Sequence, residues 1–285
     1  MKRLTVMVLT LAVLAGTGMA TSFLGRSSTM NKQNQFFGWT NFGYNQTATS
    51  YNWSSGKYET PDGFVPTKTI SCDLTLAYGL ANNFDIDAVF PLAMKQKDTF
   101  KSQGLGDLMV YARWGVLQDP DKPLKAALIF GANFPTTSKT ADPALSDRTT
   151  DVAFGFSATT KKLGNFLAHI RAAYWYNGYL PDSVADSQTK VGDMFEYNLT
   201  FDYSVTKTIT PELAFVGSMR DNTVWGATWV PHTQVSQHTA NVLVIWKPIS
   251  ILTIRPKVGL PLTPISEGGT LANWSGGLDV WVYVP

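Results

Sequence analysis

Cysteine is nearly absent from this chain, and so are long apolar stretches after its first residues. The 285 residues include one cysteine, Cys72, which excludes an internal disulfide framework and a cysteine-based metal cluster. Charged residues make up 15% of the chain, whereas about 25% is typical of soluble proteins. No later segment reaches the roughly 18 apolar residues that a transmembrane helix needs. These deficits exclude a disulfide scaffold and a bundle of membrane helices, and they are unusual for a soluble domain.

The N-terminus has the form of a secretory signal peptide. Residues 1–3 include two basic side chains, residues 4–14 are apolar, and residues 18–20 offer small side chains for cleavage. An uncleaved N-terminal anchor is the alternative. The formal net charge of +2 depends on the two basic residues of this leader, so charge gives no reason to expect a nucleic-acid partner. We predict a signal peptide at 1–20, a short N-terminal segment at 21–33 and a single folded domain at 34–285.

The chain does contain, repeated along its length, an alternation of apolar and polar residues. In "KTISCDLTLAYG", Ile70, Cys72 and Leu74 alternate with Ser71 and Asp73. Alternation with period two over about ten residues indicates a β-strand with two unlike faces. Twelve strand-like segments follow one another: 35–44, 68–79, 84–93, 106–116, 123–134, 151–160, 166–176, 195–205, 211–220, 238–246, 251–260 and 277–284.

The connections between these segments alternate in length. Short links are expected at 79–83, 117–123, 161–165, 205–211 and 247–250, and longer ones at 45–68, 94–104, 135–150, 178–192, 221–235 and 262–273. Outer-membrane barrels have this arrangement because their periplasmic turns are short and their external loops are long. An even number of strands also brings both chain ends to the periplasmic side.

The charged residues of the strands are confined to one parity. In the segments whose faces can be assigned, the apolar parity contains no Asp, Glu, Lys or Arg. A soluble sandwich would show the same partition in any one strand, but its strands usually have about five or six residues. The charged positions on the polar parity are Asp73, Asp85, Asp87, Asp107, Arg113, Lys125, Asp151, Arg171, Glu196, Asp202, Glu212, Arg220, Arg255, Lys257 and Asp279.

Aromatic residues gather near both ends of the apolar faces, as the two membrane interfaces select. Tyr78 and Trp114 flank short turns, whereas Phe134 and Tyr174 flank long loops. We therefore predict an all-β fold: a transmembrane β-barrel of about 12 antiparallel strands in an up-and-down meander, located in the outer membrane of a Gram-negative bacterium. The apolar faces contact outer-membrane lipid, and the polar faces line a lumen.

The predicted lumen wall combines charge with aromatic surface. Nine inward carboxylates oppose six inward cations, and such a wall screens permeants by charge while its aromatic rings offer stacking surfaces. No cofactor and no metal site are expected. The candidate permeation residues are Asp85, Asp87, Asp107, Tyr111, Arg113, Lys125, His169, Arg171, Trp175, Glu196, Asp202, Arg220, Arg255 and Lys257.

An enzyme is the sharpest alternative that the residues suggest. Ser236 and His238 share the apolar parity, and twelve-stranded outer-membrane phospholipases place a Ser-His-Asn site on the outer barrel wall. A nucleophile and its base need hydrogen-bond reach and a third, orienting group, and no phospholipase-like motif surrounds this pair. His169, by parity, is expected in a lumen charge network. We expect no enzymatic activity.

Three short motifs resemble the outer-membrane family named after the meta-cleavage pathway of phenol degradation. They are "QGLGDLMVYARW" at 103–114, "NFPTT" at 133–137, where Thr137 replaces the usual glycine, and "TTDVAFGFSAT" at 149–159. The chain also ends in Val-Tyr-Val-Pro instead of an aromatic residue. The resemblance implies an outer-membrane transporter connected with aromatic catabolism.

Together, these observations predict a channel that passes small aromatic or amphipathic molecules by passive diffusion. A structural or receptor-like barrel without transport is the alternative, and a barrel-embedded hydrolase is a minor one. Expected partners are membrane lipid, a small-molecule permeant and the barrel-assembly machinery during biogenesis. The oligomeric state does not follow from the sequence.

Overall fold

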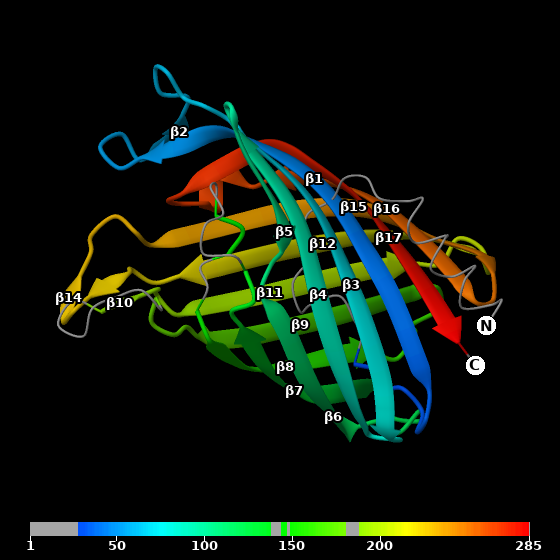
Figure 1. Ribbon diagram of the computed structural model, residues 1–285. Helices are drawn as coiled ribbons and strands as arrows, with labels where there is room; N and C mark the ends of the chain where they lie inside the picture. Colours follow the sequence, from blue (N-terminus) through cyan, green and yellow to red (C-terminus); the bar gives the residue numbers. More distant parts are fainter. Residues whose placement is uncertain (1–27, 138–143, 147–148, 181–187, 285) are drawn as a thin grey trace.

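The protein is a closed antiparallel β-barrel (Figure 1). The computed structural model describes residues 28–137, 144–146, 149–180 and 188–284, so the predicted signal peptide lies outside the described residues. The barrel strands are β1 (Phe36–Asn52), β3 (Thr67–Ala81), β4 (Phe84–Lys97), β6 (Leu108–Leu117), β7 (Leu124–Phe134), β8 (Asp151–Thr160), β9 (Phe166–Tyr176), β11 (Met194–Tyr203), β12 (Ile209–Arg220), β15 (Val235–Ile249), β16 (Leu252–Pro261) and β17 (Thr270–Val284). The predicted twelve-stranded meander is confirmed.

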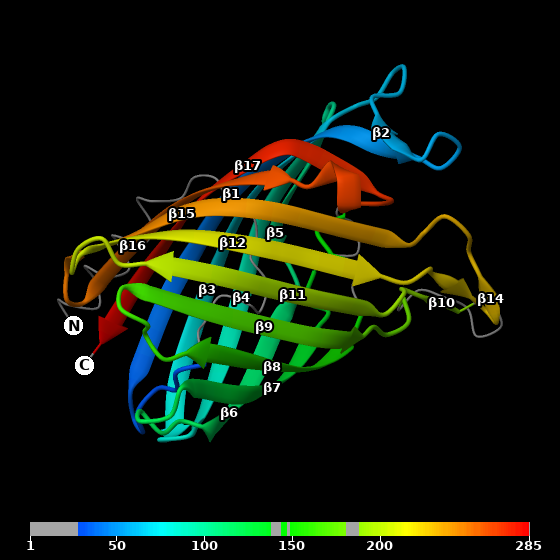
Figure 2. The same cartoon turned by 180° about the vertical axis from the view of Figure 1, so that it is seen from behind.

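Closure depends on the first and last barrel strands. β17 pairs with β1 in continuous register from Phe36↔Val284 to Asn45↔Ser275, and Figures 1 and 2 show the two strands side by side. Each strand therefore has a hydrogen-bonded neighbour on both sides. A lipid-exposed sheet edge would leave backbone groups unsatisfied, at several kcal/mol each. Closure removes both edges.

Short turns and long loops lie at opposite ends of the barrel, as predicted. The strands extend further into the long-loop end than the sequence indicated, because the loops form paired hairpins that continue the sheet. β1, for example, continues to Asn52 and pairs there with β2. The additional elements are β2 (Lys57–Glu59), β5 (Phe100–Leu105), β10 (Thr189–Lys190), β13 (Val224–Trp225), β14 (Thr228–Trp229) and the short 3-10 helix η3 (Thr263–Ile265). Within the described part of the chain, no helix has the length and apolar character needed to cross a membrane.

The two faces of the barrel are as different as the alternation predicted. On the outside, Val242, Phe154 and Leu260 are 62%, 56% and 57% exposed. On the inside, Asp73 and Asp87 are 2% and 5% exposed. Large apolar side chains that cover a whole outer wall fit a lipid environment and would be unfavourable in water.

One strand carries a matched pair of positions that tests this face assignment. Val242 lies on the outer wall near the middle of β15, and Asn241, one residue earlier, points inward between Ala214 and Gly259. Val242→Arg is expected to lower the free energy of unfolding by about 2–4 kcal/mol, because it places a cation at the bilayer midplane. Asn241→Arg is expected to be much milder, since two small neighbours leave room in a polar lumen. Denaturant unfolding in lipid vesicles measures both, and equal losses would show that the register is wrong.

Candidate functional site: the barrel lumen

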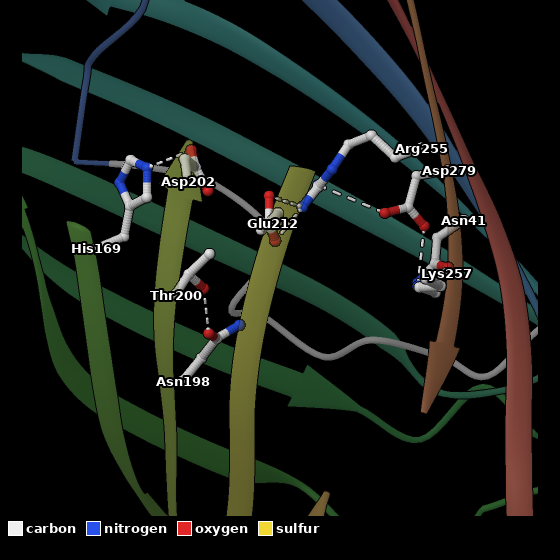
Figure 3. A network of polar contacts seen from close by, with 9 residues as sticks. All are labelled: Asn41, His169, Asn198, Thr200, Asp202, Glu212, Arg255, Lys257 and Asp279. Atoms are coloured by element: carbon white, nitrogen blue, oxygen red, sulfur yellow. Dashed lines mark hydrogen bonds and ion pairs between the residues drawn. The ribbon is translucent and has the colours of Figure 1, made fainter. Parts of the chain in front are cut away.

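Charged side chains form a network across the periplasmic half of the lumen (Figure 3). The short turns define this half, because His169, Asp202 and Glu212 all lie within a few residues of them. His169 Nε2 lies 3.1 Å from Asp202 Oδ2, and its Nδ1 lies 2.9 Å from the hydroxyl of Thr159. The inward charge network predicted for His169 is therefore present.

Arg255 is the centre of this network. Its guanidinium donates to both carboxylate oxygens of Glu212, at 2.8 and 2.9 Å, and lies 3.4 Å from Asp279 Oδ2. Figure 3 shows it extending between these two carboxylates. Strand β15 separates β12 from β16 and contributes the buried Leu243 at this level. The ion pair therefore passes over an apolar side chain, and this explains why the polar alternation of β15 is weak.

Lys257 connects the network to the barrel closure. Its amino group donates to Asp279 Oδ1 at 2.9 Å and to Asn41 Oδ1 at 2.8 Å. Asn41 belongs to β1, whose faces the sequence left unassigned, and it pairs directly with Asp279. Three strands, β16, β17 and β1, are thus joined by side chains as well as by backbone hydrogen bonds.

A second charged group lies on β4 and β6. Asp85 pairs across the strands with Arg113, and the guanidinium lies 3.6 Å from Asp85 and 3.9 Å from Asp87. The backbone N–H of Asn31 donates to Asp85 at 3.1 Å, and Arg113 donates to the carbonyl of Thr29 at 3.4 Å. The described part of the N-terminal segment therefore lies inside the periplasmic half of the lumen.

Two strand glycines leave room for this N-terminal segment. A Cβ on Gly115 would lie 2.7 Å from Met30 Cγ, and a Cβ on Gly79 would overlap the carbonyl of Lys32. Gln118 donates to the carbonyl of Ser28 at 2.9 Å. The segment thus fits a space that these strands provide, and it occupies part of the lumen cross-section.

The external half of the wall has a different chemistry. Tyr111 and Trp175 pack edge to face with ring centroids 6.3 Å apart, across Gly131, where a Cβ would approach the tyrosine ring to 2.7 Å. The indole N–H of Trp175 donates to Glu196 at 3.0 Å. We call this the aromatic cluster; it consists of Val89, Tyr111, Ala153 and Trp175, with Met109 and Met194 packed against it. The sequence identified the two rings but missed the aliphatic and sulfur-containing members, although the inward parity of Val89 and Met109 would have revealed them.

Two predicted lumen carboxylates hold loops in place. Asp107 Oδ1 accepts hydrogen bonds from the backbone of Thr136 and from both the backbone and the hydroxyl of Thr137. Asp151 accepts from Asn133 and from the backbone of Gly178. The residue that replaces the family's usual glycine, Thr137, therefore adds a donor to a loop anchor.

The remaining predicted cations are spread along the lumen. Lys125, near a short turn, and Arg220, at the long-loop end of β12, are half-buried. Arg171 is 7% exposed and pairs across strands with Ser157 and Asn198. In the described residues, no group of three or more His, Cys, Asp or Glu side chains is placed to hold a metal ion.

The external rim contains a cleft of ≈ 610 Å³ between β2 and the loop around η3. Tyr58 lines it and donates its hydroxyl to the carbonyl of Gly268 at 2.7 Å. Burial, with smaller contributions from Tyr51 and Glu267, raises the pKa of Tyr58 to about 12. The phenol stays protonated at neutral pH and continues to tie the hairpin to the loop.

The serine–histidine pair on the outer wall does have a third partner. Ser236 Oγ lies 2.9 Å from His238 Nε2, and the hydroxyl of Tyr197 lies 2.8 Å from His238 Nδ1. Gly217 of β12 lies between Tyr197 of β11 and His238 of β15, and its lack of a side chain lets these two rings meet. The third partner is a tyrosine hydroxyl and not the asparagine of a Ser-His-Asn site, and His238 is only 8% exposed. The arrangement favours a structural role, in which side-chain hydrogen bonds join β11 and β15 on the outer wall, over a hydrolytic site.

Comparison with known proteins agrees with this architecture. The family described as "Putative MetA-pathway of phenol degradation" matches residues 42–248. The chain belongs to this family. The resemblance predicted from the three short motifs is confirmed. A separate comparison with curated protein sequences found no match.

Several solved structures of other proteins have the same barrel fold as this chain. The COG4313 outer membrane channel from Pseudomonas putida F1 superimposes with a TM-score of 0.76 at 11% identity, over 93% of this chain and 100% of that chain. The NanC porin gives 0.52 at 9% identity, over 87% and 99%. The CymD monoaromatic hydrocarbon channel gives 0.50 at 7% identity, over 95% and 94%. This chain therefore has the barrel fold of outer-membrane channels, and the predicted location in the outer membrane agrees with that fold.

The network around Arg255 is expected to contribute to the stability of the barrel. Arg255→Met leaves Glu212 and Asp279 without their shared partner, so the free energy of unfolding is expected to fall by about 3–5 kcal/mol. Adding Glu212→Leu removes the carboxylate that has lost its partner, so the double variant is expected to recover part of the lost free energy of unfolding. Denaturant unfolding of the single and double variants gives both values. A single variant as stable as the wild type would show that the lumen ions are individually well hydrated.

The fit of the N-terminal segment can be tested at Gly115. The side chain of Gly115→Val overlaps Met30 and Gln118, so it is expected to displace the segment and raise single-channel conductance. Gly38→Val is the control, because a Cβ there meets its nearest atom at an ordinary 3.6 Å. Ser28→Cys, in a Cys72→Ser background, is expected to react faster with a water-soluble maleimide when Gly115→Val is present. Unchanged conductance and labelling would mean that the segment does not occupy this space in the membrane.

Proposed function

We propose that the protein is an outer-membrane channel that passes small aromatic or amphipathic molecules by passive diffusion. The aromatic side chains of the lumen wall carry the proposal: an aromatic cluster lies in the external half, and the rings of Phe37, Trp39 and Trp281 lie beside the charged network in the periplasmic half. A purely aqueous pore has no need of a tryptophan, a tyrosine and two methionines on its wall.

The aromatic cluster suits transient contact with an aromatic ring. Edge-to-face aromatic contacts contribute about 0.5–1.5 kcal/mol beyond area burial, and a methionine sulfur beside a ring adds about 0.3–1.5 kcal/mol. Contacts of this strength slow a permeant without trapping it. Met109 lies opposite Val89 and Met194 opposite Trp175, and both methionines can change rotamer to accommodate rings of different shape.

The charged network gives the second half of the pathway its selectivity. Carboxylates outnumber cations on the inward parity by nine to six, so a weak preference for cations is expected where ions pass. Seven of these charges form ion pairs with one another, in the groups around Arg113, Arg255 and Lys257. Paired charges provide a hydrated surface with little net field.

The comparisons support this proposal at the level of fold and family. One neighbour in fold is named as a monoaromatic hydrocarbon channel, and the family's description refers to phenol degradation. Both names agree with the chemistry of the aromatic cluster. The proposal includes no catalytic activity; the outer-wall histidine is buried and contacts a tyrosine hydroxyl, an arrangement that suits packing of the wall. Recognition by the barrel-assembly machinery remains a prediction.

A receptor-like barrel without transport is the second candidate. The external hairpins that carry β2, β10 and β14 extend the surface available to an outside partner (Figure 2). A barrel of this kind would bind a macromolecule at its loops and conduct neither ions nor solutes.

Planar bilayers containing the purified protein test the channel function. We expect discrete conductance steps with a weak cation preference, and the double variant Asp85→Asn, Asp87→Asn is expected to shift the reversal potential toward anions, because Arg113 then lacks its counter-charges. Asp121→Asn, in an exposed turn, is the matched control and should leave the potential unchanged. Absence of conductance, together with binding of an external macromolecule, would favour the receptor. A shift toward cations in the double variant would show that these aspartates do not face the ion path.

A further inference from the structure

A row of long polar side chains crosses the outer wall of the barrel at its external end. Gln46 of β1 pairs with Lys68 of β3. Lys68 in turn pairs with Gln96 of β4, which pairs with Lys101 of β5. Directly paired residues of neighbouring strands lie on the same face of a sheet. That face is the outer one, because Asp73, on the other parity of β3, is buried in the lumen. We call these four paired residues the polar row.

The length of β3 places the polar row at the external edge of the apolar band. Tyr78, at the short-turn end, lies on the same face ten residues from Lys68. Ten residues of strand extend about 33 Å, and a tilt of about 40° reduces this to about 25 Å along the membrane normal, which is the height of the apolar band of such barrels. The rings of Tyr44 and Trp274, with centroids 5.8 Å apart, belong to the external aromatic girdle next to the row. Lys68 therefore lies at the level of the lipid headgroups.

The two lysines of the polar row have accessible ammonium groups. Both side chains are exposed, and neither forms an ion pair or a hydrogen bond within the part of the chain that the structure describes. Lys95, on the inward parity of the same hairpin, instead donates to the carbonyls of Ala144 and Leu145. The hydroxyl of Tyr44 donates to Gln46 Oε1 at 3.1 Å, so the amide of Gln46 presents its N–H groups as donors. The row contains donors and positive charge but no carboxylate.

Apolar side chains continue from the polar row toward the middle of the membrane. Leu92 and Leu105 pair with each other, are 45% and 49% exposed, and lie on the outer face four residues from Gln96 and Lys101 respectively. The aliphatic stem of a lysine can lie along such a surface while its ammonium group stays in the headgroup layer. The surface therefore matches an amphiphile whose acyl chains contact the leucines and whose anionic headgroup contacts the row.

We propose that the polar row binds the phosphorylated headgroup of a glycolipid of the external leaflet, of the lipid A type. Phosphate oxygens accept the hydrogen bonds that the row donates, and their charge complements the two ammonium groups. Lys68 and Lys101 are two strands apart, at about 10 Å between Cα atoms, so a disaccharide headgroup with a phosphate at each end can contact both. This inference goes beyond the proposed channel function and does not rest on it.

Titration of the purified, folded protein with lipid tests the site, with native mass spectrometry as the readout. The probes are lipid A with both phosphates and the same lipid after both phosphates have been removed. We expect the phosphorylated lipid to bind about thirtyfold more tightly, because each lysine near an anionic lipid surface contributes about a fivefold factor. Equal affinity of the wild-type protein for the two lipids would overturn the proposal.

A pair of double variants with the same change in charge locates the binding. Lys68→Gln with Lys101→Gln removes both ammonium groups of the row, so it is expected to lower the affinity for phosphorylated lipid A about thirtyfold, to that of the dephosphorylated lipid. Lys161→Gln with Lys162→Gln, in the exposed short turn between β8 and β9, is the matched control and should leave the affinity unchanged. Heat-dependent gel migration verifies that both are folded. A row variant that binds like the wild type, or a control that loses as much, would refute the site.

Inorganic phosphate and phosphatidylglycerol separate this site from a general attraction of anions. Neither probe carries two phosphates at the ends of a disaccharide, so we expect excess phosphate not to displace lipid A and phosphatidylglycerol to bind more weakly than lipid A. Displacement by phosphate would mean that the lysines hold a free anion, and equal affinity for phosphatidylglycerol would mean an unspecific basic surface; either result contradicts the proposal. The polar row lies on the outer wall, so the test gives the same answer whether or not the lumen conducts.

Discussion

Backbone hydrogen bonding in a medium without water is the constraint on which this structure depends. Every N–H and C=O group of a strand in hydrocarbon needs a partner from another strand, so the meander has to return to its beginning. The pairing of β17 with β1 meets this requirement. The regular alternation of side chains follows from it, because each strand in a closed sheet has one face toward lipid and one toward the lumen.

Closure also brings charges together that are far apart in the chain. Lys257, Asp279 and Asn41 meet because the last strand lies beside the first, and Arg255 reaches Glu212 across an intervening strand (Figure 3). A low-dielectric outer wall penalises unpaired charge strongly. Side chains that point inward therefore pair with one another, and the same pairs reinforce the seam where the barrel closes.

The two halves of the lumen differ in the groups that their walls bring together. The external half contains the aromatic cluster, where a solute first leaves bulk water, and the periplasmic half contains the charged network and part of the N-terminal segment. An amphipathic solute that moves inward would exchange contacts with the aromatic cluster for contacts with the charged network. Glycines at 79 and 115 shape the final part of the path by admitting the segment.

The sequence by itself determined the strands, their inward and outward faces, the alternation of loop lengths and hence the barrel, because each of these is a local property with a fixed period. It also placed Tyr111, Trp175 and His169 on the inward parity of their strands. Only the tertiary structure decided which residues meet. The Arg255–Glu212 pair, the contact of Tyr197 with the outer-wall histidine, and the role of Asp107 as a loop anchor all depend on strand register and on closure, and alternation along one strand contains no information about the register of its neighbours.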